Sequence, residues 1–456
     1  MDTLFVRNNL TYRIDLIYRA YPNEKLVWFY ELLSSHLLIK DPELIGEIFV
    51  KNFDNFCDKI PESSHKNRIL QNLTNMSGNK WKYMRTKLIP TFYPSKLKTM
   101  YASIDHCAQI LSSHIREHAR TYQPIDAKEI MIRFTMDVIG CCVFGLEFNA
   151  LKDPDSEFRK IGKLFLDPSP ENTFRRIISF LDTVGYFKKL FNFQDFSPKL
   201  EHFFFNLLRN SKEFPKTESM MKKDFIQFML DIKNEELTDE DKDVIFTEEV
   251  IASNIFLFFV AGFMTTSSVL SFCLYELALN PEIQERIRNE IEHVRNSHNE
   301  VLNSDVLTKL VYMEMVISET LRKYPPIPLA RRICTRSYQI PGTDMVFPLN
   351  THVAAPVYSI HHDKRYYENP EKFDPERFTE ENRARRIPYT YIPFGTGPRI
   401  CIAVRFAKME MKCCLAELLR KYKFTPYDKT DIPVVIYKAR SLYSPEGPIL
   451  LAVQEI

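Results

Sequence analysis

The sequence predicts a mainly α-helical protein with small β-sheets, and the placement of apolar and proline residues along its 456 positions supports this fold class. The patterning over residues 42–324 is helix-rich. Pro325, Pro326 and Pro328 then end it, because proline lacks an amide hydrogen and clashes with the preceding helical turn. We expect short strands at residues 332–335, 338–340 and 352–356, then a loop-rich meander over residues 361–396 and a final hairpin over residues 442–453.

Two helices frame the predicted site. Residues 250–279 form the longest apolar segment, but their longest uninterrupted run, residues 255–264, is too short for a membrane span of ~20 apolar residues. We therefore interpret the segment as a long buried helix. A second helix is expected over residues 404–422, where apolar side chains recur at helical spacing. They are Val404, Ala407, Met411, Cys414, Leu415 and Leu418.

Composition limits the classes of function. The formal charge of +2, from 61 basic and 59 acidic residues, gives no argument for nucleic acid as a partner. Nine cysteines show neither a disulfide framework nor zinc-like spacing. A reducing, cytosol-facing location is the expectation that follows.

Cys401, in the segment from Pro393 to Ala403, is the candidate metal ligand. Two of the eleven glycines, Gly395 and Gly397, precede it, which indicates a close backbone approach. The predicted helix begins at the cysteine, and its free amides and dipole would stabilise a negative sulfur and lower the thiol pKa. Arg399 is placed to reach an anionic cofactor edge. The alternative is a buried structural cysteine before a C-terminal helix.

Four motifs together carry a family resemblance. The segment Phe394-Gly395-x-Gly397-x-Arg399-x-Cys401 resembles the haem-thiolate loop of cytochrome P450 monooxygenases. Three further motifs occur in that family's order, and the resemblance runs from about Asp41 onward, most like the insect microsomal family-six P450s. They are Ala261-Gly262-Phe263-Met264-Thr265-Thr266, Glu319-x-x-Arg322 and Pro375-Glu376-Arg377-Phe378.

The resemblance implies a cytochrome P450 fold with a single haem domain over residues 41–456, binding haem b with Cys401 as the axial thiolate on iron. Residues 1–40 are interpreted as an N-terminal remnant that lacks the family's membrane anchor and hinge. Charged and polar residues within positions 1–21 exclude a span there.

The long helix is expected to form the oxygen side of the haem. The resemblance implies that Ala261 and Gly262 leave room for dioxygen and that Thr265 relays protons, with Thr266 as a substitute. Met264 stands where the family usually has an acid, so we expect less coupled turnover with more peroxide released. The alternatives are a threonine that bonds the preceding turn's carbonyl and a methionine that only packs.

A charge network is predicted behind the haem. Glu319 and Arg322 lie three residues apart on one predicted helix, and the resemblance adds Arg377 as the third member. Such pairs are usually exposed and weak, whereas removing one member of a buried network costs several kcal/mol. In the family this network holds the meander and hence the cysteine loop.

Haem carries two propionates, so cationic side chains are expected at its edge. The resemblance implies that Trp81 and Arg85, one helical turn apart, contact a propionate together with Arg332 and Arg399, and that Phe394 belongs to the cofactor site. Each arginine alone would pass for a surface residue, and Trp81 for a core aromatic.

A basic stripe follows Cys401. Arg405, Lys408 and Lys412 recur at helical spacing and are the predicted docking face for NADPH-cytochrome P450 reductase, with cytochrome b5 as a further candidate partner. A solvated helix face is the alternative. Residues 174–205 mix aromatic and lysine residues, which suits peripheral membrane contact but also a buried helical pair.

The predicted function is therefore a haem-thiolate monooxygenase that inserts one atom of dioxygen into an apolar small molecule, a xenobiotic or a lipid-like compound, with electrons from NADPH through the reductase. The implied location is the cytosolic face of the endoplasmic reticulum membrane, and we expect a monomer. Two alternatives remain: a P450 that uses or rearranges peroxides, and a catalytically weak protein that binds haem or sequesters ligands.

Overall fold

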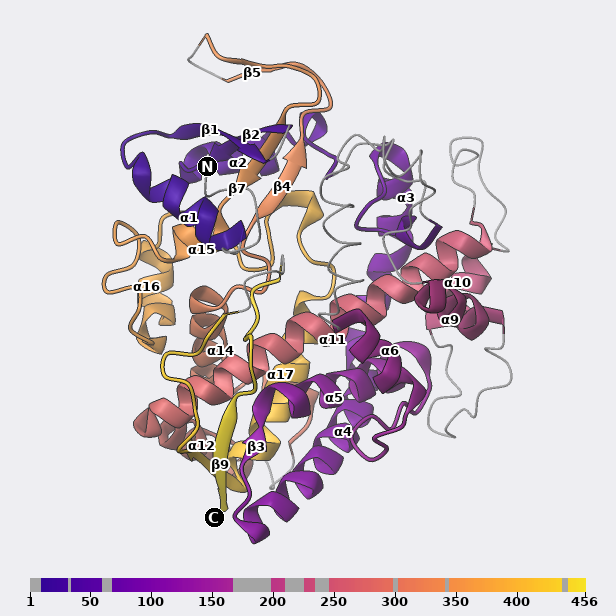
Figure 1. Ribbon diagram of the computed structural model, residues 1–456, viewed down its shortest axis with the longest axis vertical. Coiled ribbons are helices and arrows are strands. Elements are labelled where there is room, and N and C mark those ends of the chain that lie inside the picture. Colours follow the sequence, from indigo (N-terminus) through magenta and orange to yellow (C-terminus); the bar gives the residue numbers. More distant parts are fainter. Residues whose placement is uncertain are drawn as a thin grey trace.

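The computed structural model describes residues 10–31, 34–59, 68–166, 198–209, 225–233, 246–297, 302–340, 344–436 and 442–456. Helices dominate these residues and three small sheets accompany them, so the predicted fold class is confirmed (Figure 1). The helices are α1 Leu10–Ala20, α2 Pro42–Gly46, α3 Gly78–Leu88, α4 Pro94–Thr121, α5 Ala127–Ile139, α6 Glu157–Leu166, α9 Pro198–Arg209, α10 Phe225–Lys233, α11 Glu248–Leu279, α12 Pro281–Asn296, α13 Ser304–Leu307, α14 Val311–Lys323, α15 Val357–His361, α16 Glu380–Arg385 and α17 Val404–Leu419.

Helix α11 runs through the middle of the molecule, with α5, α14 and α17 packed near it (Figure 1). The side chain of Thr247 caps its start by accepting a hydrogen bond from the Val250 amide at 3.2 Å. By length and apolar composition α11 is the one described helix that qualifies as a membrane span, yet 67% of its most apolar stretch is buried inside the protein. It is a core helix, as the sequence predicted.

The three sheets join distant parts of the chain. The largest has the order β1-β2-β7-β4, in which β2 pairs with β7 in parallel, so the first strands meet strands from the last third of the sequence. The other two have the orders β3-β9-β8 and β5-β6. The strands are β1 Leu26–Glu31, β2 Ser34–Ile39, β3 Ile125–Asp126, β4 Ala330–Ile333, β5 Tyr338–Gln339, β6 Val346–Phe347, β7 His352–Ala355, β8 Tyr422–Pro426 and β9 Leu450–Glu455.

Several element boundaries differ from the prediction. The expected final hairpin is not the main pairing, because β9 pairs with β8 and β3, and only an Ile436–Pro445 bridge crosses the described part of that loop. The helix expected over residues 404–422 does begin at Val404 but ends at Leu419, so it starts three residues after Cys401 rather than at the cysteine. The meander contains the short helix α16.

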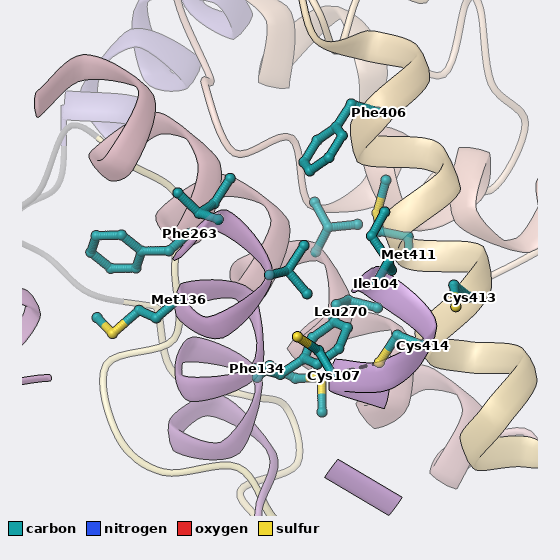
Figure 2. Packing of buried hydrophobic residues seen from close by; sticks show 14 of the residues in the cluster. Ile104, Cys107, Phe134, Met136, Phe263, Leu270, Phe406, Met411, Cys413 and Cys414 are labelled. Atoms are coloured by element: carbon teal, nitrogen blue, oxygen red, sulfur yellow. Dashed lines mark hydrogen bonds between the residues drawn. The ribbon is translucent and has the colours of Figure 1, made fainter. Parts of the chain in front are cut away.

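The main hydrophobic core lies where α4, α5, α11 and α17 meet (Figure 2). Phe134 of α5, Phe263 and Leu270 of α11 and Met411 of α17 all project into it. A second buried cluster lies under the four-stranded sheet. The main core fixes α11 and α17, the two helices that carry the predicted chemistry.

Candidate functional site

A tight turn presents Cys401 just before α17. The amide of Cys401 donates to the carbonyl oxygen of Phe394 at 3.0 Å, and the amide of Ile400 donates to the Gly397 carbonyl at 2.9 Å. The one-turn 3₁₀ helix Gly397–Arg399 lies between them. These bonds close residues 394–401 into a loop with the cysteine at its end.

Glycine is required at one position of this loop for a packing reason. A Cβ on Gly397 would lie 2.0 Å from the carbonyl oxygen of Phe49, and the residue has φ +72°. Gly395 has φ +76° but no atom within 4 Å of its Cβ position. The close approach expected from the sequence is therefore present at Gly397, while Gly395 supplies only the left-handed backbone angle.

Cys401 is an exposed residue, although protein atoms crowd around its thiol. Burial raises its pKa, while the amide of Ala403 and the charges of Lys59 and Arg85 lower it. The net direction is upward, so the predicted lowering of the thiol pKa was wrong: the desolvation cost exceeds the help from one amide and two cations. Coordination to a metal ion would keep the sulfur as a thiolate regardless.

Four cationic side chains lie around the cysteine loop: Lys59, Arg85, Arg332 and Arg399. Burial, with the charges of Arg332 and Arg399 beside it, lowers the pKa of Lys59 to about 7. Burial also lowers the pKa of Arg332 to about 10 and, together with Arg332, that of Arg399 to about 9. These lowered pKa values indicate an excess of positive charge in a poorly solvated place.

The guanidinium of Arg399 already has several partners within the protein. Its guanidinium donates to the carbonyl oxygens of Cys57 at 2.8 Å and Met76 at 2.7 Å, and it lies 3.4 Å from Asp58. It also lies 4.1 Å above the Trp81 ring. Arg399 therefore ties the cysteine loop to residues 57–76, in addition to contributing charge.

Arg85 and Arg332 are less fully bonded. Arg85 donates to the Ile400 carbonyl at 2.8 Å, which links α3 to the residue before Cys401. Arg332 reaches the Arg331 carbonyl at 2.7 Å, but its buried Nε has no partner among the described residues. Among these residues, Asp58 is the one carboxylate in ion-pair contact with any of the four cations.

These residues fit haem. The cofactor brings iron for a sulfur ligand and two carboxylates for cationic donors. Cys401 offers a sulfur ligand for the iron. The surrounding cations, among them Arg332 with its unpaired Nε, offer donors for the two carboxylates. The predicted residues Trp81, Arg85, Arg332, Phe394 and Arg399 all belong to this neighbourhood.

Ala261 and Gly262, in the predicted oxygen-binding segment of α11, differ in their surroundings. Ala261 is exposed although most of α11 is buried. Gly262 faces α5, because a Cβ there would lie 2.3 Å from Ile139 Cδ1. The small size of Gly262 therefore allows α11 and α5 to approach, and its role in making room for dioxygen stays a prediction.

Thr265, Met264 and Thr266 point to three different neighbourhoods. The Thr265 hydroxyl donates to the Ala261 carbonyl at 2.7 Å, the bond that a helical threonine ordinarily makes. Met264 lines a small, partly open pocket together with Ser267, Ser268 and Ser271 among others. Thr266 is buried toward α17.

The charge network predicted behind the site is present and fully buried at its centre. Arg322 donates to both oxygens of Glu319, at 2.7 and 2.8 Å, and to the carbonyls of His361 and Pro370, at 2.8 and 2.7 Å. Arg377 is the outer member, with its Nε 3.5 Å from Glu319. The network fastens α14 to the meander that leads to the cysteine loop.

The predicted docking stripe is not one exposed surface. Lys412 is buried and donates to the carbonyls of Leu307 and Leu310, and both Lys408 and Lys412 are ion-paired with Glu314, at 2.5 and 3.1 Å. Of the three predicted residues only Arg405 is exposed. The predicted membrane-contact segment, residues 174–205, lies outside the described residues except for the start of α9.

Sequence reasoning missed two residues. Lys59 belongs to the cationic cluster, and no local pattern marks it. Glu410 is completely buried on α17. Its spacing, three residues after Ala407 and four before Cys414 of the apolar stripe, could have identified it, because an acid within such a stripe is unusual.

The fold and the site define a haem-thiolate oxidoreductase class. A family model, Cytochrome P450, matches residues 9–453. The chain belongs to the cytochrome P450 family and is a P450 monooxygenase, whose haem iron is held by a thiolate.

Curated relatives support the resemblance to the insect family-six enzymes. Cytochrome P450 6k1 of Blattella germanica is 36% identical over 451 residues, covering 95% of this chain and 85% of that protein. Probable cytochrome P450 6a13 of Drosophila melanogaster is 35% identical over 440 residues, covering 96% and 87%. Probable cytochrome P450 6a14 of the same organism is 36% identical over 453 residues, covering 96% and 89%.

Proposed function

We propose that this monooxygenase acts on an apolar small molecule, with Cys401 as the axial ligand of its haem. The observation that carries the proposal is the closed loop over residues 394–401, which holds an exposed cysteine among four cations, two of them buried. When bound, the haem supplies the oxygen chemistry, and a thiolate ligand favours O–O cleavage. Residues 41–456 form the haem domain in this proposal.

The cations around Cys401 hold the cofactor carboxylates. Arg332 has an unpaired Nε, and Lys59 lacks a described carboxylate partner at ion-pair distance, so both gain most from an anion. Arg85 and Arg399 already bond backbone carbonyls, and they brace the loop and the Trp81 side chain against the cofactor.

Electrons reach the site from NADPH through a reductase, with cytochrome b5 as a further candidate donor. Arg405 is exposed close behind Cys401, and Lys82 is exposed on α3, the helix that Arg85 connects to the cysteine loop. Each offers an exposed positive charge for docking an acidic flavoprotein. A reductase of this kind places the protein at the cytosolic face of the endoplasmic reticulum membrane.

The test is the reduced carbon monoxide difference spectrum of the purified protein. Wild type should take up haem and give the band of a thiolate-ligated haem, and Cys401→Ser should lose it. Cys57→Ser is the matched control, because Cys57 is a half-buried thiol beside the same cations. An unchanged spectrum in Cys401→Ser would refute the assignment, as would equal loss in the control.

A second candidate, peroxide-driven or peroxide-rearranging chemistry, is favoured by Met264, which cannot transfer protons. Turnover with an organic peroxide that greatly exceeds turnover with NADPH and reductase would select it. Haem uptake with neither activity would instead indicate a protein that binds haem or sequesters ligands.

A further inference from the structure

His361 is a completely buried histidine between helix α14 and the segment that leads to the cysteine loop. It is the last residue of α15, it is 0% exposed, and α15 packs against α14. Its Nδ1 lies 3.1 Å from the carbonyl oxygen of Arg322, and its Nε2 accepts a hydrogen bond from the Ile392 amide at 3.1 Å. Each ring nitrogen therefore has a backbone partner, one on either side.

These two partners fix the protonation state of the ring. A carbonyl oxygen can only accept a hydrogen bond and an amide N–H can only donate one, so Nδ1 carries the hydrogen and Nε2 keeps its lone pair. A second proton, on Nε2, would oppose the Ile392 amide. Burial, with the charges of His362 and Arg322, lowers the pKa of His361 well below its ordinary value, which agrees with a neutral ring.

Helix α14 holds this ring in position and orientation. The Arg322 guanidinium donates to the His361 carbonyl at 2.8 Å, so the two residues exchange two hydrogen bonds. The ring of Tyr391 stacks on the imidazole with the centroids 5.5 Å apart, and its hydroxyl donates to the Ser318 carbonyl of α14 at 3.0 Å. The imidazole therefore has a fixed place relative to the helix that carries the charge network.

The backbone of Ile392 connects the imidazole to the cysteine loop. Its carbonyl accepts a hydrogen bond from the Gly395 amide at 3.0 Å, which closes the turn at the start of the loop. The Cys401 amide in turn donates to the carbonyl of Phe394, a residue within that turn, at 3.0 Å. A series of hydrogen bonds therefore leads from α14 through the His361 ring to the turn on which the loop closes.

We propose that His361 is a positioning residue for the axial sulfur: its ring fixes the Ile392 backbone relative to α14, and with it the place of Cys401. The proposal rests on the proposed function, in which Cys401 ligates haem. Side chains that orient a metal ligand from behind typically change metal affinity or activity by about 10- to 100-fold when they are removed. The neutral ring moves no proton in this role.

The first test reads the ring itself and needs no haem. In protein with isotope-labelled histidine nitrogens, the resonances of His361 are assigned by their loss in His361→Gln. They should be those of a neutral ring that carries its hydrogen on Nδ1. A hydrogen on Nε2, or an imidazolium at neutral pH, would overturn the proposal, because neither form can accept the hydrogen bond from Ile392.

The second test separates the two hydrogen bonds of the ring. The side-chain oxygen of His361→Gln reaches the position of Nε2 and can accept from Ile392, whereas the shorter amide of His361→Asn reaches only the position of Nδ1 and can donate to the Arg322 carbonyl. The readout is the fraction of bound haem that gives the thiolate band. It should fall on the order of 10-fold in His361→Asn and in His361→Leu, and His361→Gln should restore much of it. Equal fractions in the Gln and Asn variants, or a wild-type fraction in His361→Leu, would overturn the proposal.

The neighbouring His362 supplies a matched control for lost stability. It is also buried, its Nδ1 lies 2.9 Å from the Tyr358 carbonyl, and its ring stacks on the Tyr358 ring at 4.1 Å. His362→Gln should lower the urea midpoint but keep the wild-type thiolate fraction, because these contacts do not involve the cysteine loop. An equal loss of that fraction in His362→Gln would overturn the proposal. Absence of the thiolate band in wild type would instead refute the proposed function, with the His361 tautomer unchanged.

Discussion

The cysteine loop contains a pair of glycines that allows packing strain to be separated from backbone strain. Gly395 and Gly397 both have positive φ, +76° and +72°, so alanine at either position costs about 1 kcal/mol for the left-handed backbone. Only at Gly397 would the new Cβ also meet an atom, the Phe49 carbonyl oxygen at 2.0 Å. That oxygen belongs to backbone, which cannot rotate away as a side chain would.

Gly397→Ala should therefore lose about 2 to 4 kcal/mol of unfolding free energy, the sum of the backbone term and an overpacking term of about 1 to 3 kcal/mol. Gly395→Ala should lose only about 1 kcal/mol. Gly447→Ala is the control, because Gly447 has neither positive φ nor an atom within 4 Å of its Cβ position. It should stay within about 0.5 kcal/mol of wild type.

Urea unfolding followed by circular dichroism measures these differences as midpoint shifts at constant slope. Haem content, read from the reduced carbon monoxide spectrum, should follow the same order, because the loop that Gly397 allows is the one that presents Cys401. Equal losses in the Gly395 and Gly397 variants would refute the packing argument. So would full stability and haem content in Gly397→Ala.

Three further predictions concern the charge network, pH and the oxygen side of the haem. Arg322→Ala should cost about 3 to 5 kcal/mol in urea unfolding and abolish haem uptake, because Glu319 loses its main partner in the core and keeps only the outer Arg377 and the Asp374 amide; a smaller cost than in the Glu319→Leu/Arg322→Met double variant would contradict this. Burial lowers the pKa of His362 to about 3, so below pH 6.5 the unfolded chain binds a proton that the folded chain refuses. The stability from this group is full above pH 6.5 and falls by up to about 1.4 kcal/mol per pH unit toward pH 3, a slope that His362→Gln should reduce in urea midpoints. Met264→Glu should raise the product formed per NADPH consumed, and an unchanged ratio would show that no acid is missing there.

The features that could be predicted from the sequence are those that depend on residues close together along the chain. The three-residue separation of Glu319 and Arg322 already places the two side chains on one helix face, and the structure joins them by two hydrogen bonds. The glycines before Cys401 predicted a tight loop, and one of them, Gly397, has the close contact that such a loop implies. The helix, strand and proline patterns gave the fold class for the same local reason.

The features that could not be predicted depend on partners far along the chain. From the sequence, Lys412 looks like a surface residue. In the structure it is buried, because it pairs with Glu314 and donates to the Leu307 carbonyl at the end of α13. Gly262 lies beside the expected oxygen site, but Ile139 occupies the space it faces. Lys59 becomes part of the site only because the chain folds residues 57–59 against the cysteine loop.

The parallel pairing of β2 with β7 has a consequence for biosynthesis. His36 aligns with His352, so the amino-terminal hairpin must wait for about 300 further residues, on the order of 15 to 60 seconds of translation, before its edge is covered. During that interval an unpaired strand bearing Leu37 and Leu38 is open to intermolecular association. Yield in cells should therefore depend on chaperones that shield this nascent hairpin, independently of how stable the finished enzyme is.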